Sequence, residues 1–312
     1  MRQRFALVVN ERAGSIRPRL LKQVLASLRK AGASVTPVEA RNSEEATRLV
    51  HEIARTGSAD AVIAAGGDGT IRAVAAGVSG TSLPVGIIPL GTGNVMKHEI
   101  GLASGAGDIA HTLLEGPIIS ARAGLVNGAP FLLMAGAGFD GRIVAGLDHK
   151  TKRLLGRAAY AGPVARALAA GAEPFDVDVD GTHYEANWVI VTNAAHYGGS
   201  FVLTRQTQLG ANRLIAIIVT GKTRRALLAA SLALATGRLA NPAACPKGVI
   251  VRPARHVKIG ARVPVHVEVD GDEAGVAPVE ITSGGPEVHL IATPAYVADL
   301  TNRHTNHLPL GV

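Results

Sequence analysis

Three short glycine-rich segments, each placed after an apolar run, could bind phosphate. The most marked is Gly-Gly-Asp-Gly-Thr at residues 66–70, which follows the apolar run Ala61–Ala65 and precedes a helical pattern. Glycine lets the backbone approach a ligand closely, and the N–H groups at a helix N-terminus bind anions. Asp68 could reach a nucleotide-bound Mg²⁺ or orient the loop, and Thr70 could cap the helix or contact phosphate. The alternative is an ordinary tight turn between a strand and a helix.

The other two segments follow the same design. Gly-Thr-Gly-Asn at residues 91–94 comes after the apolar run 85–89, and residues 10–14 (Asn-Glu-Arg-Ala-Gly) come after the run 5–9. We expect a nucleotide to be bound by Asn10, Gly14, Gly66, Gly67, Asp68, Gly69, Thr70, Gly91, Thr92 and Asn94, with Asp68 as the metal ligand.

Alternating strands and helices must position these loops. The patterns predict strands at 5–9, 34–38, 61–65 and 85–88 and helices at 18–31, 43–55 and 71–78, with Ser43 as a candidate N-cap. Strands that alternate with helices over short connections indicate an α/β domain with a parallel sheet. Ligands bind at the carboxyl ends of the strands in such sheets. The chain has no G-x-x-x-x-G-K-[ST] sequence, so it is not a P-loop protein.

The pattern changes near residue 121. Extended runs follow, interrupted by helical stretches at 152–170 and 223–239, and Asp180-Gly181 has the form of a hairpin turn. This half predicts a mainly β domain, a sandwich. We therefore expect domains at 1–122 and 123–302, with a flexible tail at 303–312.

A cluster of acidic residues follows the predicted strand 265–269. Asp270, Asp272 and Glu273 stand here with Gly271 between the first two. A carboxylate near the attacking oxygen could accept the proton of a hydroxyl during phosphoryl transfer. The alternative is an Asp-Gly hairpin turn with solvated acids.

Composition narrows the classes of function. The chain has 312 residues, a formal charge of +8 and one cysteine, Cys245, so an internal disulfide is excluded. The longest apolar stretch, 226–235, falls short of the roughly 20 residues that span a bilayer, so membrane contact would be peripheral.

Basic residues flank that stretch and also gather around 150–166, and they could face an anionic membrane or be a solvated surface. Only 3% of residues are aromatic and no nucleic-acid-binding module appears, so we expect no nucleic-acid partner.

In order and spacing, the segments at 9–14, 66–70 and 89–94 resemble the diacylglycerol kinase catalytic family, which includes bacterial lipid kinases and sphingosine kinases. A weaker resemblance continues at 136–140 (Gly-Ala-Gly-Phe-Asp) and at 270–272. The resemblance implies a nucleotide-binding domain like that of NAD kinases and phosphofructokinases, followed by a β-sandwich. It also implies ATP and Mg²⁺ as cofactors and a lipid substrate at the membrane surface. Such a protein would be cytoplasmic, with contact on the inner membrane face, and a homodimer stays open.

The resemblance also assigns the chemistry and shows where this chain departs. The family has Asp-Gly-Glu where this chain has Asp270-Gly271-Asp272, which places Asp272 as proton acceptor, with Asp270 and Asp68 as its catalytic partners. An acidic segment of the family that holds a structural Mg²⁺ falls on Gly-Ala-Asn at 210–212, which supplies no carboxylate. These departures leave open a non-catalytic regulator that binds nucleotide or lipid. A kinase with a soluble acceptor also stays open, because relatives in the wider superfamily share the Gly-Gly-Asp-Gly segment.

Overall fold

The chain forms two compact units. The computed structural model describes residues 1–10, 17–148, 151, 155–171, 173–207, 209–211, 213–260 and 263–306. The first unit combines Met1–Ala121 with Glu287–Val312, and the second is Arg122–Pro286. The second unit is thus inserted into the first.

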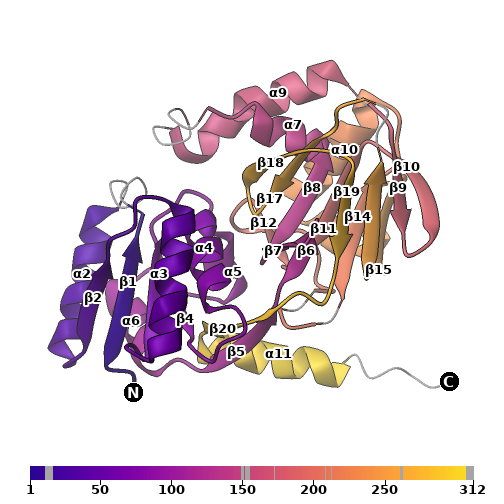
Figure 1. The fold of residues 1–312 in the computed structure, drawn as a ribbon. Helices are drawn as coiled ribbons and strands as arrows, with labels where there is room; N and C mark the ends of the chain where they lie inside the picture. The colour runs from indigo at the N-terminus through magenta and orange to yellow at the C-terminus, as the bar shows by residue number, and fades with distance from the viewer. Residues whose placement is uncertain are drawn as a thin grey trace. The chain divides into compact units, whose positions relative to one another are not determined.

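The first unit is an α/β domain built on one sheet (Figure 1). Its strands are β1 (Arg4–Val9), β2 (Ser34–Val38), β3 (Ala61–Gly66), β4 (Val85–Pro89), β5 (Ile118–Arg122) and β20 (Glu287–Ile291), in the order β2-β1-β3-β4-β20-β5. The pairs β1–β2, β1–β3, β3–β4 and β4–β20 are parallel. The fold class expected for this half is therefore confirmed.

Helices connect or follow these strands. They are α2 (Pro18–Lys30), α3 (Ser43–Thr56), α4 (Asp68–Val78), α5 (Val95–Glu99), α6 (Ala106–Glu115) and α11 (Pro294–Asn306). Helix α2 packs against α6 and α3 packs against α4. Every residue of β3 and β4 is buried, as expected for parallel strands covered on both faces.

The ends of α3 show how local sequence fixes an element. The side chain of Asn42 accepts the backbone N–H of Glu45 at 2.8 Å, and Gly57 ends the helix in the left-handed conformation, with φ 62°. The prediction of Ser43 as N-cap was wrong by one residue. The N-cap is Asn42, because its side-chain oxygen is the one that accepts an N–H of the first turn.

The second unit is a sandwich of two antiparallel sheets. One has the order β10-β9-β16-β19-β6-β7 and the other β15-β14-β11-β8-β17-β18. The strands of these sheets are β6 (Gly124–Val126), β7 (Ala129–Phe131), β8 (Met134–Gly138), β9 (Phe175–Val179), β10 (Thr182–Ala186), β11 (Trp188–Thr192), β14 (Leu214–Val219), β15 (Val249–Ala254), β16 (His256–Gly260), β17 (His266–Val269), β18 (Asp272–Val276) and β19 (Val279–Thr282). Strands β12 (His196–Tyr197) and β13 (Phe201–Val202) pair with each other in a separate sheet. Side chains of both sheets, among them Phe131, Phe175 and Val267, form one buried core.

Short helices connect these strands. They are α7 (Phe139–Ala145), η1 (Gly156–Tyr160), α9 (Ala161–Ala170), α10 (Arg224–Ala235), η2 (Arg238–Ala240) and η3 (Pro242–Ala244). The predicted helix at 223–239 is thus broken after Ala235, where Gly237 adopts φ 70°. No helix among the described residues is long and apolar enough to span a bilayer.

Two hairpins of this unit have the same turn. Asp180-Gly181 joins β9 to β10, as predicted, and Asp270-Gly271 joins β17 to β18. Both residues of each turn have positive φ, at 50° and 82° in the first and 52° and 84° in the second. Asp-Gly is favoured in such turns because aspartate tolerates, and glycine readily adopts, the left-handed conformation.

The expected second boundary was wrong. We expected the β domain to continue to residue 302, but the chain leaves it after Pro286, and β20 enters the first sheet between β4 and β5. Strand β20 pairs with β4, with Leu290 opposite Val85. Because these residues are far apart in the sequence, local sequence patterns cannot predict this pairing. The expected tail at 303–312 begins inside α11, and residues 307–312 lie outside the described residues.

Candidate functional site

The glycine-rich loops come together at one edge of the first sheet. Strands β1, β3 and β4 are neighbours and parallel, so the loops that follow them leave the sheet at the same end. The Asn10 side-chain N–H donates to the Thr70 hydroxyl at 3.3 Å, which links the first loop to the second. The structure therefore brings together every residue of the expected nucleotide site except Gly14, which lies outside the described residues.

The second and third loops touch through their backbones. A Cβ atom built on Gly91 would lie 2.5 Å from the Cα of Gly67, closer than any two such atoms can approach. A Cβ on Gly66 would lie 2.2 Å from the Thr70 hydroxyl oxygen. These two glycines are therefore required by close packing, beyond what an ordinary turn needs, and the tight turn considered above does not explain them. Gly69 lies in the first turn of α4, and Thr92 lies half-exposed in its loop.

Asp68 ties two loops together. Its carboxylate accepts the backbone N–H groups of Val95 at 3.0 Å and Met96 at 3.1 Å, and so caps α5. Asn94, which precedes this helix with φ 49°, donates its side-chain N–H to the Gly91 carbonyl at 2.7 Å. Of the two roles considered for Asp68, orienting the loop is the one that these contacts describe.

Among the described residues, no group of three His, Cys, Asp or Glu side chains could hold a metal ion. Asp68 offers one carboxylate, which is held at the junction of the second and third loops. Mg²⁺ is commonly bound by one or two carboxylates together with substrate phosphates. The residues therefore fit an ion that arrives on the nucleotide. Asn212, in the segment where a structural metal was doubtful, lies outside the described residues.

In the second unit, Asp270 is an anchor. Its carboxylate accepts the backbone N–H groups of Leu132 at 3.1 Å, Leu133 at 2.9 Å and Met134 at 3.0 Å, and its side chain is buried. Its own N–H donates to the Met134 carbonyl at 2.9 Å. These contacts fix the β17–β18 turn against the start of β8.

Asp272 and Glu273 stand beyond this turn, at the start of β18. Asp272 is half-exposed, while Glu273 is exposed and lies 3.7 Å from the His266 ring. The turn that the sequence offered as the alternative reading is present, and it presents Asp272 to solvent on a fixed support.

A buried pair of acids lies next to this turn, and the sequence analysis missed it. Asp140, from the start of α7, accepts a hydrogen bond from the Tyr197 hydroxyl, and Glu268 of β17 accepts the Gly271 N–H at 2.7 Å. Asp140 and Glu268 are each 2% exposed. Both carboxyls point at Gly136, where a Cβ would lie 2.2 Å from Asp140 Oδ2 and 2.8 Å from Glu268 Oε1. An acid at a strand position flanked by buried valines, as Glu268 is, was the available signal.

The pair is most stable with a proton between its members. Burial raises the pKa of Asp140 to about 6, opposed by the Tyr197 hydrogen bond. Burial and then the charge of Asp140 raise the pKa of Glu268 well above its usual value. Asp140 Oδ2 and Glu268 Oε1 have no donor among the other described groups, so a shared proton satisfies both. The Trp188 indole N–H also favours ionised Asp140, although it makes no well-aligned hydrogen bond.

The comparisons with known proteins agree with this architecture. The family described as "Diacylglycerol kinase catalytic domain" matches residues 4–126, and the "YegS C-terminal NAD kinase beta sandwich-like domain" matches residues 134–292. The second match alone spans half of the chain, and the two follow each other in family order. The chain belongs to the diacylglycerol kinase catalytic-domain family.

Individual relatives are distant. The chain is 27% identical to the diacylglycerol kinase of Bacillus subtilis (strain 168), over 93% of this chain and 96% of that protein. It is 29% identical to the uncharacterised protein sll0036 of Synechocystis, over 84% of this chain but only 63% of that longer protein. A crystal structure from Bacillus anthracis strain Sterne matches with a TM-score of 0.76 and 21% identity, over 95% of this chain and 97% of that one, which establishes the fold alone.

The contact between Gly67 and Gly91 can be tested by adding one methyl group. Gly91→Ala should lower the free energy of unfolding by roughly 1–3 kcal/mol, because the methyl group has no space beside the Gly67 backbone. The matched control is Gly93→Ala, whose Cβ would meet only Asp68 Oδ2 at 3.6 Å, an ordinary contact. Urea denaturation of the three proteins measures the difference. Equal stability of the two variants would contradict the close packing of the loops.

The shared proton predicts a stability that depends on pH. Because both carboxyls have raised pKa values in the folded chain, the native state holds a proton that the unfolded chain releases above about pH 4. Stability should therefore fall as pH rises from 4 to 8. In Glu268→Gln the amide keeps an oxygen for the Gly271 N–H and removes one charge, so its stability relative to the wild type should increase over the same range.

Urea denaturation at pH 4, 6 and 8 checks this expectation. Glu39→Gln, which removes an exposed carboxylate from the first unit, is the control and should follow the wild type at every pH. If Glu268→Gln were destabilised by the same amount at all three values, the pair would not share a proton.

Proposed function

We propose that this protein is an ATP-dependent lipid kinase that transfers the γ-phosphate to a lipid hydroxyl, with a diacylglycerol or a sphingoid-type lipid as acceptor. Family membership supports a kinase, and the similar proteins support the lipid branch. They include the "Probable lipid kinase YegS" of Escherichia coli O9:H4 (strain HS), 32% identical over 45% of this chain and 48% of that protein. The observation that carries the proposal is the joining of the loops by Asp68 and by the Gly67–Gly91 contact.

The first unit would bind the nucleotide. Backbone N–H groups at the start of α4 and in the loop at 91–94 would face its phosphates, because the first N–H groups of a helix lack partners within the helix. Asn10 and Thr70, which already contact each other, would border the same phosphates, with Gly14 in the first loop. Mg²⁺ carried by the nucleotide would neutralise phosphate charge, with Asp68 as the carboxylate that faces it.

The second unit would supply the proton acceptor. Asp272 would take the proton of the lipid hydroxyl as the oxygen bonds to the γ-phosphorus and the bond from that phosphorus to the leaving ADP oxygen breaks. We assign Asp270 a positioning role instead of the catalytic one first expected, because its carboxylate is occupied by three backbone N–H groups. Glu268 would support the same turn through the Gly271 N–H.

A lipid acceptor places the reaction at a membrane surface. We propose a cytoplasmic protein that contacts the inner membrane face peripherally and has no nucleic-acid partner.

Transfer of labelled γ-phosphate tests the function. The protein would be incubated with ATP, Mg²⁺ and a panel of diacylglycerols, monoacylglycerols, sphingoid bases and phosphatidylglycerol. Label in an organic-extractable product, absent with Asp68→Ala, is the expected result and identifies the acceptor. Label only in a water-soluble product would support the soluble-acceptor kinase, and ATP binding without any transfer would support the regulator.

The roles around the turn predict a split between two adjacent acids. Asp272→Ala should lower kcat by about 10²–10⁴-fold while ATP affinity is kept, because only proton acceptance is lost. Glu273→Ala is the matched control, one residue away and exposed, and should keep kcat. Steady-state kinetics and ATP titration separate the two effects. The reverse pattern would move the proton acceptor to Glu273, and unchanged kcat in both variants would exclude this mechanism.

A further inference from the structure

Helix α10 in the second unit carries an apolar stripe that the fold leaves uncovered. Its inner face, Leu227, Ala230, Ala233 and Leu234, is buried in the unit. On its outer face Leu228 is 55% exposed and Leu232 is 58% exposed. Residues four apart lie on the same side of a helix, so these two leucines form one exposed apolar patch.

The charge around this patch has one sign. Residues 222–248 contain five basic residues and no acidic residue. Lys222 is bound to Glu185, but the exposed Arg224, Arg225, Arg238 and Lys247 make no ion pair among the described residues. A surface of leucines between unpaired cations is suited to a partner that is both apolar and negatively charged.

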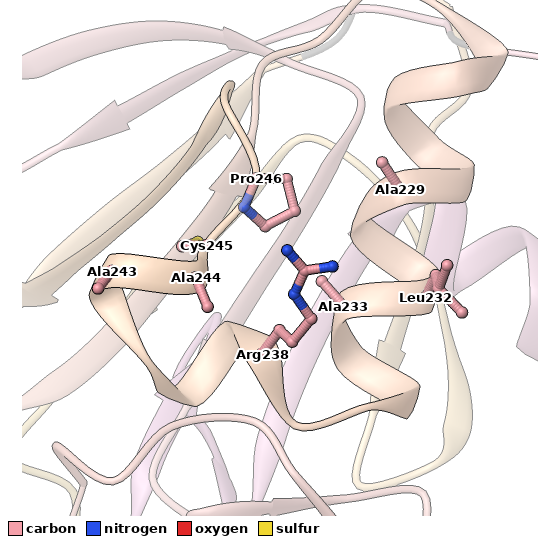
Figure 2. Close-up of a pocket in the computed structure, with 8 residues that line it drawn as sticks. All are labelled: Ala229, Leu232, Ala233, Arg238, Ala243, Ala244, Cys245 and Pro246. Carbon is pink, nitrogen blue, oxygen red and sulfur yellow. The ribbon is translucent and has the colours of Figure 1, made fainter.

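A pocket of about 300 Å³ opens beside the helix. It is lined by Ala229, Leu232 and Ala233 of α10, by Arg238, and by residues 243–246. Figure 2 shows the Arg238 side chain lying between α10 and the 243–246 segment. Apart from this guanidinium the lining is formed by small or apolar side chains, so a single cation stands at an otherwise apolar hollow.

We propose that the α10 surface, defined as Arg224, Arg225, Leu228, Leu232, Arg238 and Lys247, binds an anionic lipid bilayer. The leucines enter the boundary between head groups and acyl chains, while the cations contact lipid phosphates, with Arg238 positioned to receive one phosphate at the pocket. A neutral bilayer would bury the leucines but offer no net negative charge to the cations. The basic residues around the leucines therefore favour an anionic bilayer. The inference rests on the proposed function only in that a lipid acceptor requires a membrane encounter.

Vesicle binding without nucleotide tests the surface separately from catalysis. The full chain would be sedimented with vesicles of equal parts phosphatidylglycerol and phosphatidylcholine, and with phosphatidylcholine alone. We expect binding to the anionic vesicles that is at least tenfold stronger than to the neutral ones and that weakens as salt is raised. Absence of binding to anionic vesicles would overturn the proposal.

Paired variants locate the surface. Leu228→Ser with Leu232→Ser, and separately Arg225→Ala with Arg238→Ala, should each reduce anionic-vesicle binding about tenfold or more, and only the arginine pair should reduce the salt dependence. The apolar control is Val263→Ser with Val276→Ser, at positions 53% and 47% exposed, and the charge control is Arg29→Ala with Lys30→Ala on α2. Both controls should bind as the wild type does, and circular dichroism verifies that all variants fold.

Other outcomes separate the competing explanations. If the leucine pair left vesicle binding unchanged but turned a dimer into a monomer in size-exclusion chromatography, the surface would join two copies and the proposal would be wrong. Kinase activity on lipid in detergent micelles should be kept by both surface variants. If no lipid were phosphorylated while the variants still lost vesicle binding, the proposed function would fail and the membrane surface would stand.

Discussion

Aspartate carboxylates that accept hydrogen bonds from backbone N–H groups of distant segments fix the loops of this structure in place. Asp68 accepts hydrogen bonds from the N–H groups that begin α5, and Asp270 accepts them from three successive N–H groups at the start of β8. Asp60 does the same for Gln3 and Arg4 at the start of β1. Such bonds are stronger than neutral ones because the acceptor is charged. Glycine-rich loops have little side-chain material of their own to fix them, so these anchors determine where the loops stand.

The two units use this device differently. In the first unit one carboxylate joins two loops whose backbones are already in contact at Gly67 and Gly91. In the second unit the hairpin at 270–271 is held from both sides, by Asp270 at the β8 side and by Glu268 at the Gly271 N–H. These two carboxylates therefore fix the turn that precedes Asp272.

The sequence predicted what depends on local pattern. Strand and helix alternation, the glycine loops after β3 and β4 and the Asp180-Gly181 turn are all set by residues close in the chain, and the structure has them. The local sequence pattern could not predict contacts between residues that are distant in the chain. The Asp68 side chain was read as a metal or loop residue, but its bonds to Val95 and Met96 depend on two parallel strands lying side by side. Glu268 and Asp140 interact although they lie 128 positions apart in the sequence. Leu290 pairs with Val85 although the whole inserted unit separates them in the chain.

The insertion of one unit into the other sets the order in which the first sheet can be completed. Strand β5 stands at the sheet edge beside β20, and β20 also covers the side of β4. During synthesis β5 is complete before its neighbour β20 exists. The whole second unit must be synthesised before β20 can pair with it. Until then β4 presents an unpaired edge, the kind of surface on which chains associate wrongly. Residues 287–291 therefore complete the first sheet only after the whole second unit has been synthesised.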